Sequence, residues 1–124
     1  MTGRISRAAL AVVLTALTAQ MALASDRDVR IHLAGSGGEG AVRFRDRGSE
    51  RRLRVEIENL SVPKNSILNV TVDGKVVGTM KVTGQRSARL ELRSRGIQVV
   101  PVIAAGATLA VVGPDGDVLM KGKF

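Results

Sequence analysis

The stretch RRLRVEIEN, residues 51–59, alternates apolar and charged side chains more regularly than any other part of the chain. Leu53, Val55 and Ile57 fall on one side of an extended backbone, and arginines and glutamates fall on the other. A period of two with one apolar and one charged side is typical of an antiparallel strand with one buried face. The stretch therefore predicts a sheet with a dry inner face and a charged outer face.

Similar alternating stretches continue on both sides of this strand. Frequent turns separate them, including Asp73-Gly74, a pair suited to a two-residue hairpin because both residues tolerate positive φ. Short strands with frequent turns predict a single small antiparallel β-sandwich or barrel, all-β in class. The expected strands, about eight in number, are 29–33, 41–46, 51–59, 67–72, 75–82, 87–93, 107–112 and 118–124.

The same alternation predicts which side chains form the core. From 75–82 we expect Val76, Met80 and Val82 to point inward, whereas Gly35–Gly40 reads as a flexible connection. Residues 70–77 also resemble residues 112–119 at an offset of 42, which either a duplicated hairpin or two unrelated Asp-Gly hairpins would explain. One common core is expected to hold Phe44, Leu53, Val55, Ile57, Leu68, Val70, Val72, Leu90, Leu92 and Phe124.

The first residues predict a cleavable export signal of the Sec type. Arg4 and Arg7 give a positive start, an apolar run follows over residues 8–17, and Ala22-Leu23-Ala24 supplies small residues at the cleavage site. The run is shorter than the ~20 residues of a membrane-spanning helix, so no transmembrane span is expected after cleavage. We therefore predict a signal peptide over 1–24 and a periplasmic or secreted domain over 25–124.

Composition limits the chemistry of this domain. The chain has no cysteine, so disulfides and thiolate metal sites are excluded. It has two aromatic residues, Phe44 and Phe124, whereas single-strand nucleic-acid binders stack bases on several aromatic rings. Its net charge of +8 falls to +6 without Arg4 and Arg7. Such a field either attracts anions or keeps a small domain soluble.

Several motifs together resemble a known kind of protein. They are VEIENL (residues 55–60), the hairpin VDGKVVGT (72–79), the strand ARLEL (88–92) and the terminal DGDVLMKGKF (115–124). With these motifs the chain resembles small uncharacterised exported bacterial all-β domains. The resemblance covers nearly the whole predicted domain and implies its fold. Because the motifs are turns and core positions, they carry over no catalytic residue.

The side chains that could support catalysis or metal binding lack partners in the sequence. His32 is the one histidine of the chain, whereas zinc sites and nucleophilic triads need partner residues. Glu56 and Glu58 share a strand face, but arginines beside them favour ionised carboxylates over a general acid. Asp115 and Asp117 fall short of the six to eight oxygens that calcium takes. We expect no metal, no cofactor and no enzyme activity.

Four arginines form the candidate site. If residues 47–50 make a turn, Phe44 lies opposite Leu53, and the two flanking positions on each strand carry arginines. The guanidinium group suits bidentate contact with carboxylate, sulfate or phosphate. A solvated face that discourages edge aggregation is the alternative. The candidate anion-binding residues are Arg43, Arg45, Arg52 and Arg54.

Three interpretations of function follow from these observations. The first is an exported, non-catalytic module with a structural or adhesion and interaction role in the cell envelope. The second is an anion-binding module that takes an acidic polysaccharide or a lipid head group through its arginine-rich sheet face. The third is a hydrolytic enzyme, against which the lone histidine and scarce aromatics count. An anionic polymer or an envelope component is the expected partner, without specific nucleic-acid binding.

Overall fold

The computed structural model describes residues 26–94 and 100–124, which form eight strands and no helix. Accordingly, these residues include no helix long and apolar enough to cross a membrane. The predicted signal peptide, residues 1–24, lies outside the described residues, as do residues 25 and 95–99. The strands are β1 (Arg27–Gly35), β2 (Gly38–Asp46), β3 (Arg51–Glu58), β4 (Ile67–Val72), β5 (Lys75–Lys81), β6 (Ala88–Ser94), β7 (Thr108–Val112) and β8 (Val118–Lys123).

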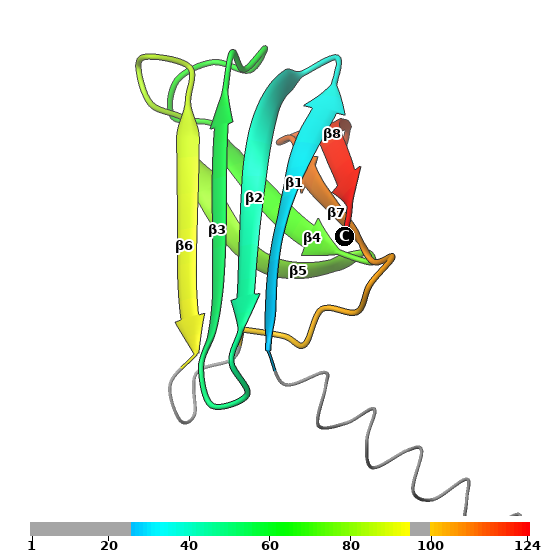
Figure 1. Ribbon diagram of the computed structural model, residues 1–124. Coiled ribbons are helices and arrows are strands. Elements are labelled where there is room, and N and C mark those ends of the chain that lie inside the picture. Colours follow the sequence, from blue (N-terminus) through cyan, green and yellow to red (C-terminus); the bar gives the residue numbers. More distant parts are fainter. Residues whose placement is uncertain (1–25, 95–99) are drawn as a thin grey trace, which may run out of the picture.

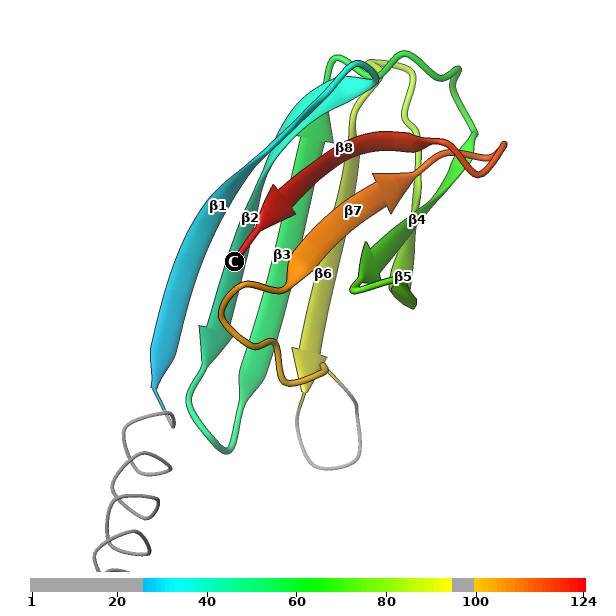
Figure 2. The same cartoon turned by 90° about the vertical axis from the view of Figure 1, so that its right-hand side faces the viewer.

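All eight strands belong to one antiparallel sheet in the order β5-β4-β7-β8-β1-β2-β3-β6. The sheet bends so far that it has two layers, with β1, β2, β3 and β6 in one and the other four strands behind (Figure 1). The view turned by 90° shows the two layers converging where β8 passes β1 (Figure 2). The fold is therefore all-β, as predicted, and its form is a nearly closed barrel.

The two seams between the layers are closed in different ways. At one seam β1 and β8 share a single pair of aligned residues, Ala34 and Lys121. There Gly122 lies so close to β1 that an added Cβ would stand 2.6 Å from the carbonyl oxygen of His32. At the other seam β5 and β6 are the two ends of the sheet, and the side chain of Leu90 packs over Gly78. Small residues thus permit both close approaches.

The predicted core is present between the layers. Phe44, Leu53, Val55, Ile57, Leu68 and Val70 are buried, whereas Val72, Leu90, Leu92 and Phe124 are partly buried and pack against them. Each fully buried large apolar side chain contributes about 1.5–3 kcal/mol. The core therefore provides the main stabilisation of a domain without disulfides.

The end of the barrel where β1 begins is closed by aromatic and cationic side chains. The rings of Phe44 and Phe124 meet edge to face at 6.1 Å between centroids. The guanidinium of Arg27 lies 5.8 Å from the centroid of Phe44 and donates a hydrogen bond to the carbonyl of Ile103. The cation and the loop before β7 thus cover an aromatic pair that would otherwise face solvent.

The glycine-rich segment at residues 35–40 is not a flexible connection, so that prediction is wrong. Gly35 pairs with Gly38, and only Ser36 and Gly37 form the turn between β1 and β2. A Cβ on Gly35 would lie 2.2 Å from the carbonyl oxygen of Leu119, to which Gly37 donates a hydrogen bond of 3.0 Å. The glycines are needed because β8 crosses directly over this turn.

The two hairpins of the second layer carry matching β-bulges. In the first, Thr71 pairs with Val76 and Val70 with Gly78, which leaves Val77 as the extra residue. In the second, Leu119 is the extra residue, because Val112 pairs with Val118 and Val111 with Met120. Val77 and Leu119 are 42 positions apart, the offset of the internal resemblance.

The first bulge overturns the prediction that Val76 points inward. The extra residue shifts the alternation by one, so Val76 joins the outer face beside Thr71 and is 60% exposed. Met80 and Val82 are buried as predicted. The preceding Asp73-Gly74 turn also agrees with the prediction, with φ angles of 50° and 83°. Strict alternation therefore fails only where the strand carries its bulge.

We expect Gly122→Ala to destabilise the protein, because its Cβ would clash with the backbone of β1. Overpacking of this kind costs about 1–3 kcal/mol, so the melting temperature should fall by roughly 5–20 °C. Gly84→Ala is the matched control, since its Cβ would meet nothing closer than 3.7 Å. That variant should melt within a few degrees of the parent protein or above it. Equal losses in the two variants would show that the β1–β8 crossing is looser than described.

Candidate functional site

The outward side chains of β1, β2, β3 and β6 form a surface that we call the charged face. Strand pairing arranges them in rows that run across the four strands. Two rows make up the arginine end: Asp28, Arg45, Arg52 and Arg93 in one, and Arg30, Arg43, Arg54 and Glu91 in the other. Two further rows make up the acidic end: His32, Ala41, Glu56 and Arg89 in one, and Ala34, Glu39 and Glu58 in the other.

The four candidate arginines meet on this face in the predicted register. Arg43 lies opposite Arg54, and Arg45 lies opposite Arg52, on either side of the buried pair Phe44–Leu53. The turn at residues 47–50 also forms, closed by a hydrogen bond of 2.9 Å from the amide of Arg47 to the carbonyl of Glu50. The sequence thus predicted the strand pairing of all four arginines.

Asp28 of β1 neutralises one side of this cluster. Its carboxylate accepts two hydrogen bonds from Arg43, at 3.1 and 2.9 Å, and lies 3.9 Å from the Nε of Arg45. The hydrogen bond from Arg43 lowers the pKa of Asp28 below its ordinary 3.8, and the same contact raises the pKa of Arg43. The pair therefore stays ionised at mildly acidic pH.

Glu91 of β6 neutralises the other side. Its Oε1 accepts hydrogen bonds from the Nε and Nη2 of Arg52, at 3.1 and 2.8 Å. Its Oε2 lies 3.7 Å from Arg54, and its Oε1 lies 3.4 Å from the Nε of Arg93. Two carboxylates thus contact five arginines, which leaves the arginine end with a strong net positive charge.

Small hollows lie between these guanidinium groups. One of about 20 Å³ is lined by all four candidate residues, Arg43, Arg45, Arg52 and Arg54. Another of about 60 Å³ lies beside it, next to Glu50 and Arg47. Within the described part of the chain, the Nε of Arg54 is buried and has no hydrogen-bond acceptor. A buried donor of this kind is costly until an acceptor reaches it.

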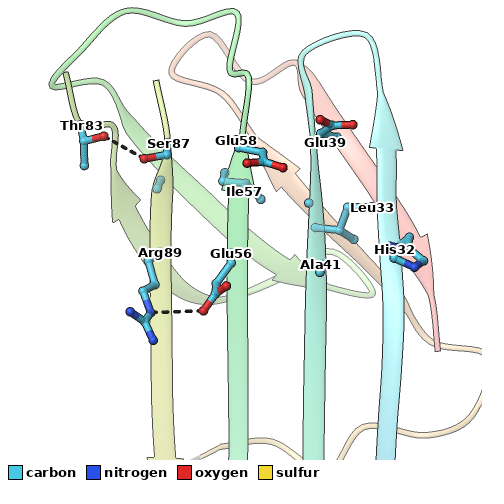
Figure 3. A pocket seen from close by; sticks show the side chains of 12 residues that line it. His32, Leu33, Glu39, Ala41, Glu56, Ile57, Glu58, Thr83, Ser87 and Arg89 are labelled. Atoms are coloured by element: carbon cyan, nitrogen blue, oxygen red, sulfur yellow. Dashed lines mark hydrogen bonds and ion pairs between the residues drawn. The ribbon is translucent and has the colours of Figure 1, made fainter. Parts of the chain in front are cut away.

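The acidic end has a different shape. A shallow hollow of about 680 Å³ lies over Gly40, Ala41 and Ala88, with Glu39, Glu56, Glu58, His32 and Arg89 around it (Figure 3). Arg89 reaches Glu56 at 3.5 Å, and Asn59 donates a hydrogen bond of 2.7 Å to Glu39. Glu39 and Glu58 lie directly opposite each other, so two like charges share this end.

Three side chains considered for catalysis or metal binding, His32, Glu56 and Glu58, are exposed at the acidic end. His32 lies on the outer face of β1 opposite Ala41, and Glu56 and Glu58 also point to solvent. Across residues 26–94 and 100–124, no group of three or more His, Asp or Glu side chains is arranged to hold a metal ion. At this end Arg89 pairs with Glu56 and Asn59 donates to Glu39, so two of its three carboxylates already have a polar partner.

The four arginines follow from the sequence pattern, but their partners do not. Asp28 and Glu91 contact them, whereas Glu56, on the same strand as Arg52 and Arg54, pairs with Arg89. Glu91 reaches the cluster because β6 is the neighbour of β3. The alternation of residues 87–93 contained Glu91 but gave no indication of which strand it would join.

Comparison with known proteins adds no functional assignment. No protein-family model matches the chain, and no curated protein matches it significantly.

The contact between Asp28 and Arg43 can be measured directly. In the parent protein, an NMR titration of the Asp28 carboxyl carbon should give a midpoint below 3.8, and Arg43→Ser should return it toward that value. Because the folded state lowers this pKa, the stability from the pair is complete above 3.8 and is lost as pH falls through the lowered midpoint. Lys121→Ser is the control and should leave the midpoint unchanged. A midpoint that Arg43→Ser does not move would contradict the contact.

Proposed function

We propose that the protein is an exported, non-catalytic interaction module of the cell envelope that binds an anionic polymer through its arginine end. The observation that carries the proposal is the small hollow lined by four arginines, one of which keeps a buried donor without an acceptor. A volume of about 20 Å³ suits one water-sized oxygen. A sulfate, phosphate or carboxylate oxygen has that size and supplies the missing acceptor.

The charge of the arginine end supports a polymer as the ligand. Six arginines stand against Asp28 and Glu91 there, a formal charge of +4 on two rows of side chains. These groups remain partly exposed, so each contact contributes little, about 0.2–1 kcal/mol. A chain with repeated acidic groups engages several arginines at once and sums those contributions. Acidic polysaccharides of the envelope have this chemistry.

Retention on a heparin column tests the proposal. The double change Arg43→Ser and Arg54→Ser should weaken binding by roughly 2- to 30-fold, from the contribution of two exposed contacts. The double change Lys121→Ser and Lys123→Ser removes the same charge from β8 and should weaken binding much less. Both variants should fold, because the four side chains lie outside the core. Equal losses would indicate diffuse basicity and would favour a structural module instead.

Removing the acidic neighbours should have the opposite effect. Asp28→Asn with Glu91→Gln frees the arginines from internal partners, so binding to heparin should strengthen. Asp115→Asn with Asp117→Asn adds the same charge at the β7–β8 turn and serves as the control. Elution at higher salt for the first variant than for the second is the expected result. If the two variants elute together, the internal carboxylates do not compete with the external anion.

A further inference from the structure

The charged face is divided along its strands into two ends of opposite charge. The arginine end has six arginines and two carboxylates, whereas the acidic end has Glu39, Glu56 and Glu58 with Arg89. With His32 neutral, the formal charges of the two ends are +4 and −2. A surface with this division is complementary to a copy of itself that is turned end for end.

We propose that the charged face binds the charged face of a second copy of this chain, with the strands of the two copies running in opposite directions. The two-fold axis of this pair lies between the copies and runs across the strands, midway between the arginine end and the acidic end. Each row of one copy then lies over a row of opposite character in the other, as an isologous interface requires.

The rows match residue by residue under this operation. On β3, Arg54 lies over Glu56 of the second copy, and Arg52 lies over its Glu58. On β2, Arg45 lies over Glu39 of the second copy. On β6, Glu91 lies over Arg89. Each of these four pairs joins opposite charges, and the symmetry produces each of them twice.

The shapes of the two ends also complement each other. Long arginine side chains cover the arginine end, whereas the acidic end is hollowed over Gly40, Ala41 and Ala88. In the proposed pair Arg43 lies over Ala41 of the second copy, where the hollow has room for it. The other face-to-face pairing, with the axis along the strands, would lay arginines over arginines and is repulsive.

The expected pair is weak. The charged face is about seven residues long, at about 3.3 Å per residue, and four strands wide, at about 4.8 Å per strand. Its area is therefore roughly 400 Å² per copy. The total surface buried on the two copies stays below about 1,000 Å², as in transient complexes. We therefore expect a dissociation constant between about 10 µM and 1 mM. The pairing uses the same arginine end that the proposed function assigns to the polymer, but it does not require a polymer ligand. A polyanion would compete with the second copy.

Sedimentation of the purified chain tests the pairing. At about 20 mM salt the parent protein should associate reversibly, and about 0.5 M salt should weaken that association at least about tenfold, because exposed charges are screened. Glu56→Arg with Glu58→Arg makes the outer side of β3 entirely positive. Arg52→Glu with Arg54→Glu makes it entirely negative. Each variant alone should be monomeric, whereas an equimolar mixture should form a heterodimer, since every β3 pair is then attractive.

Circular dichroism establishes that each variant is folded before it is mixed. If the negative variant does not fold, Glu39→Arg and Arg45→Glu on β2 form a second pair with the same logic. A parent protein that stays monomeric to about 1 mM at low salt, or folded variants that do not associate when mixed, would overturn the inference. If the protein binds heparin but does not self-associate, the proposed function is supported and the pairing is not. If it self-associates but does not bind heparin, the pairing is supported and the proposed function is not.

Discussion

In the pairing of β2 with β3, Phe44 lies opposite Leu53 while Arg43 lies opposite Arg54, so one register sets both the core and the charged face. Burial of each large apolar side chain contributes about 1.5–3 kcal/mol, whereas opposed like charges on an exposed face cost less than about 1 kcal/mol. Burial therefore decides the register. A slip of one residue would place the arginines in the core and the apolar side chains in water.

The strands on either side reduce the electrostatic cost of this register. Asp28 comes from β1 and Glu91 from β6, so each flanking strand contributes one carboxylate to the arginine cluster. These ion pairs are partly exposed and contribute modestly to stability. Their larger effect is on binding, because they occupy the donors that an external anion would need. The free Nε of Arg54 marks the point where internal neutralisation is incomplete.

Local pattern was enough to predict the eight strands, the β2–β3 register and most of the core, because each depends on alternation and turn residues. Features set by distant segments could not be predicted. The crossing of β8 over the β1–β2 turn explains Gly35 and Gly37, and nothing near them in sequence shows that crossing. Val76 is exposed because of a bulge that alternation does not reveal. Glu91 joins the site through strand order, which the sequence left open.

The seam between β5 and β6 has a consequence for the internal motions of the barrel. These two strands are the ends of the sheet, and packing such as that of Leu90 over Gly78 holds them together without a ladder of backbone hydrogen bonds. Parting them costs packing alone, whereas parting any other neighbours also breaks backbone hydrogen bonds. Local opening begins where it costs least. We therefore expect local opening to begin at this seam, and the facing amides of β5 and β6 to exchange their protons with solvent ahead of those in β2 and β3.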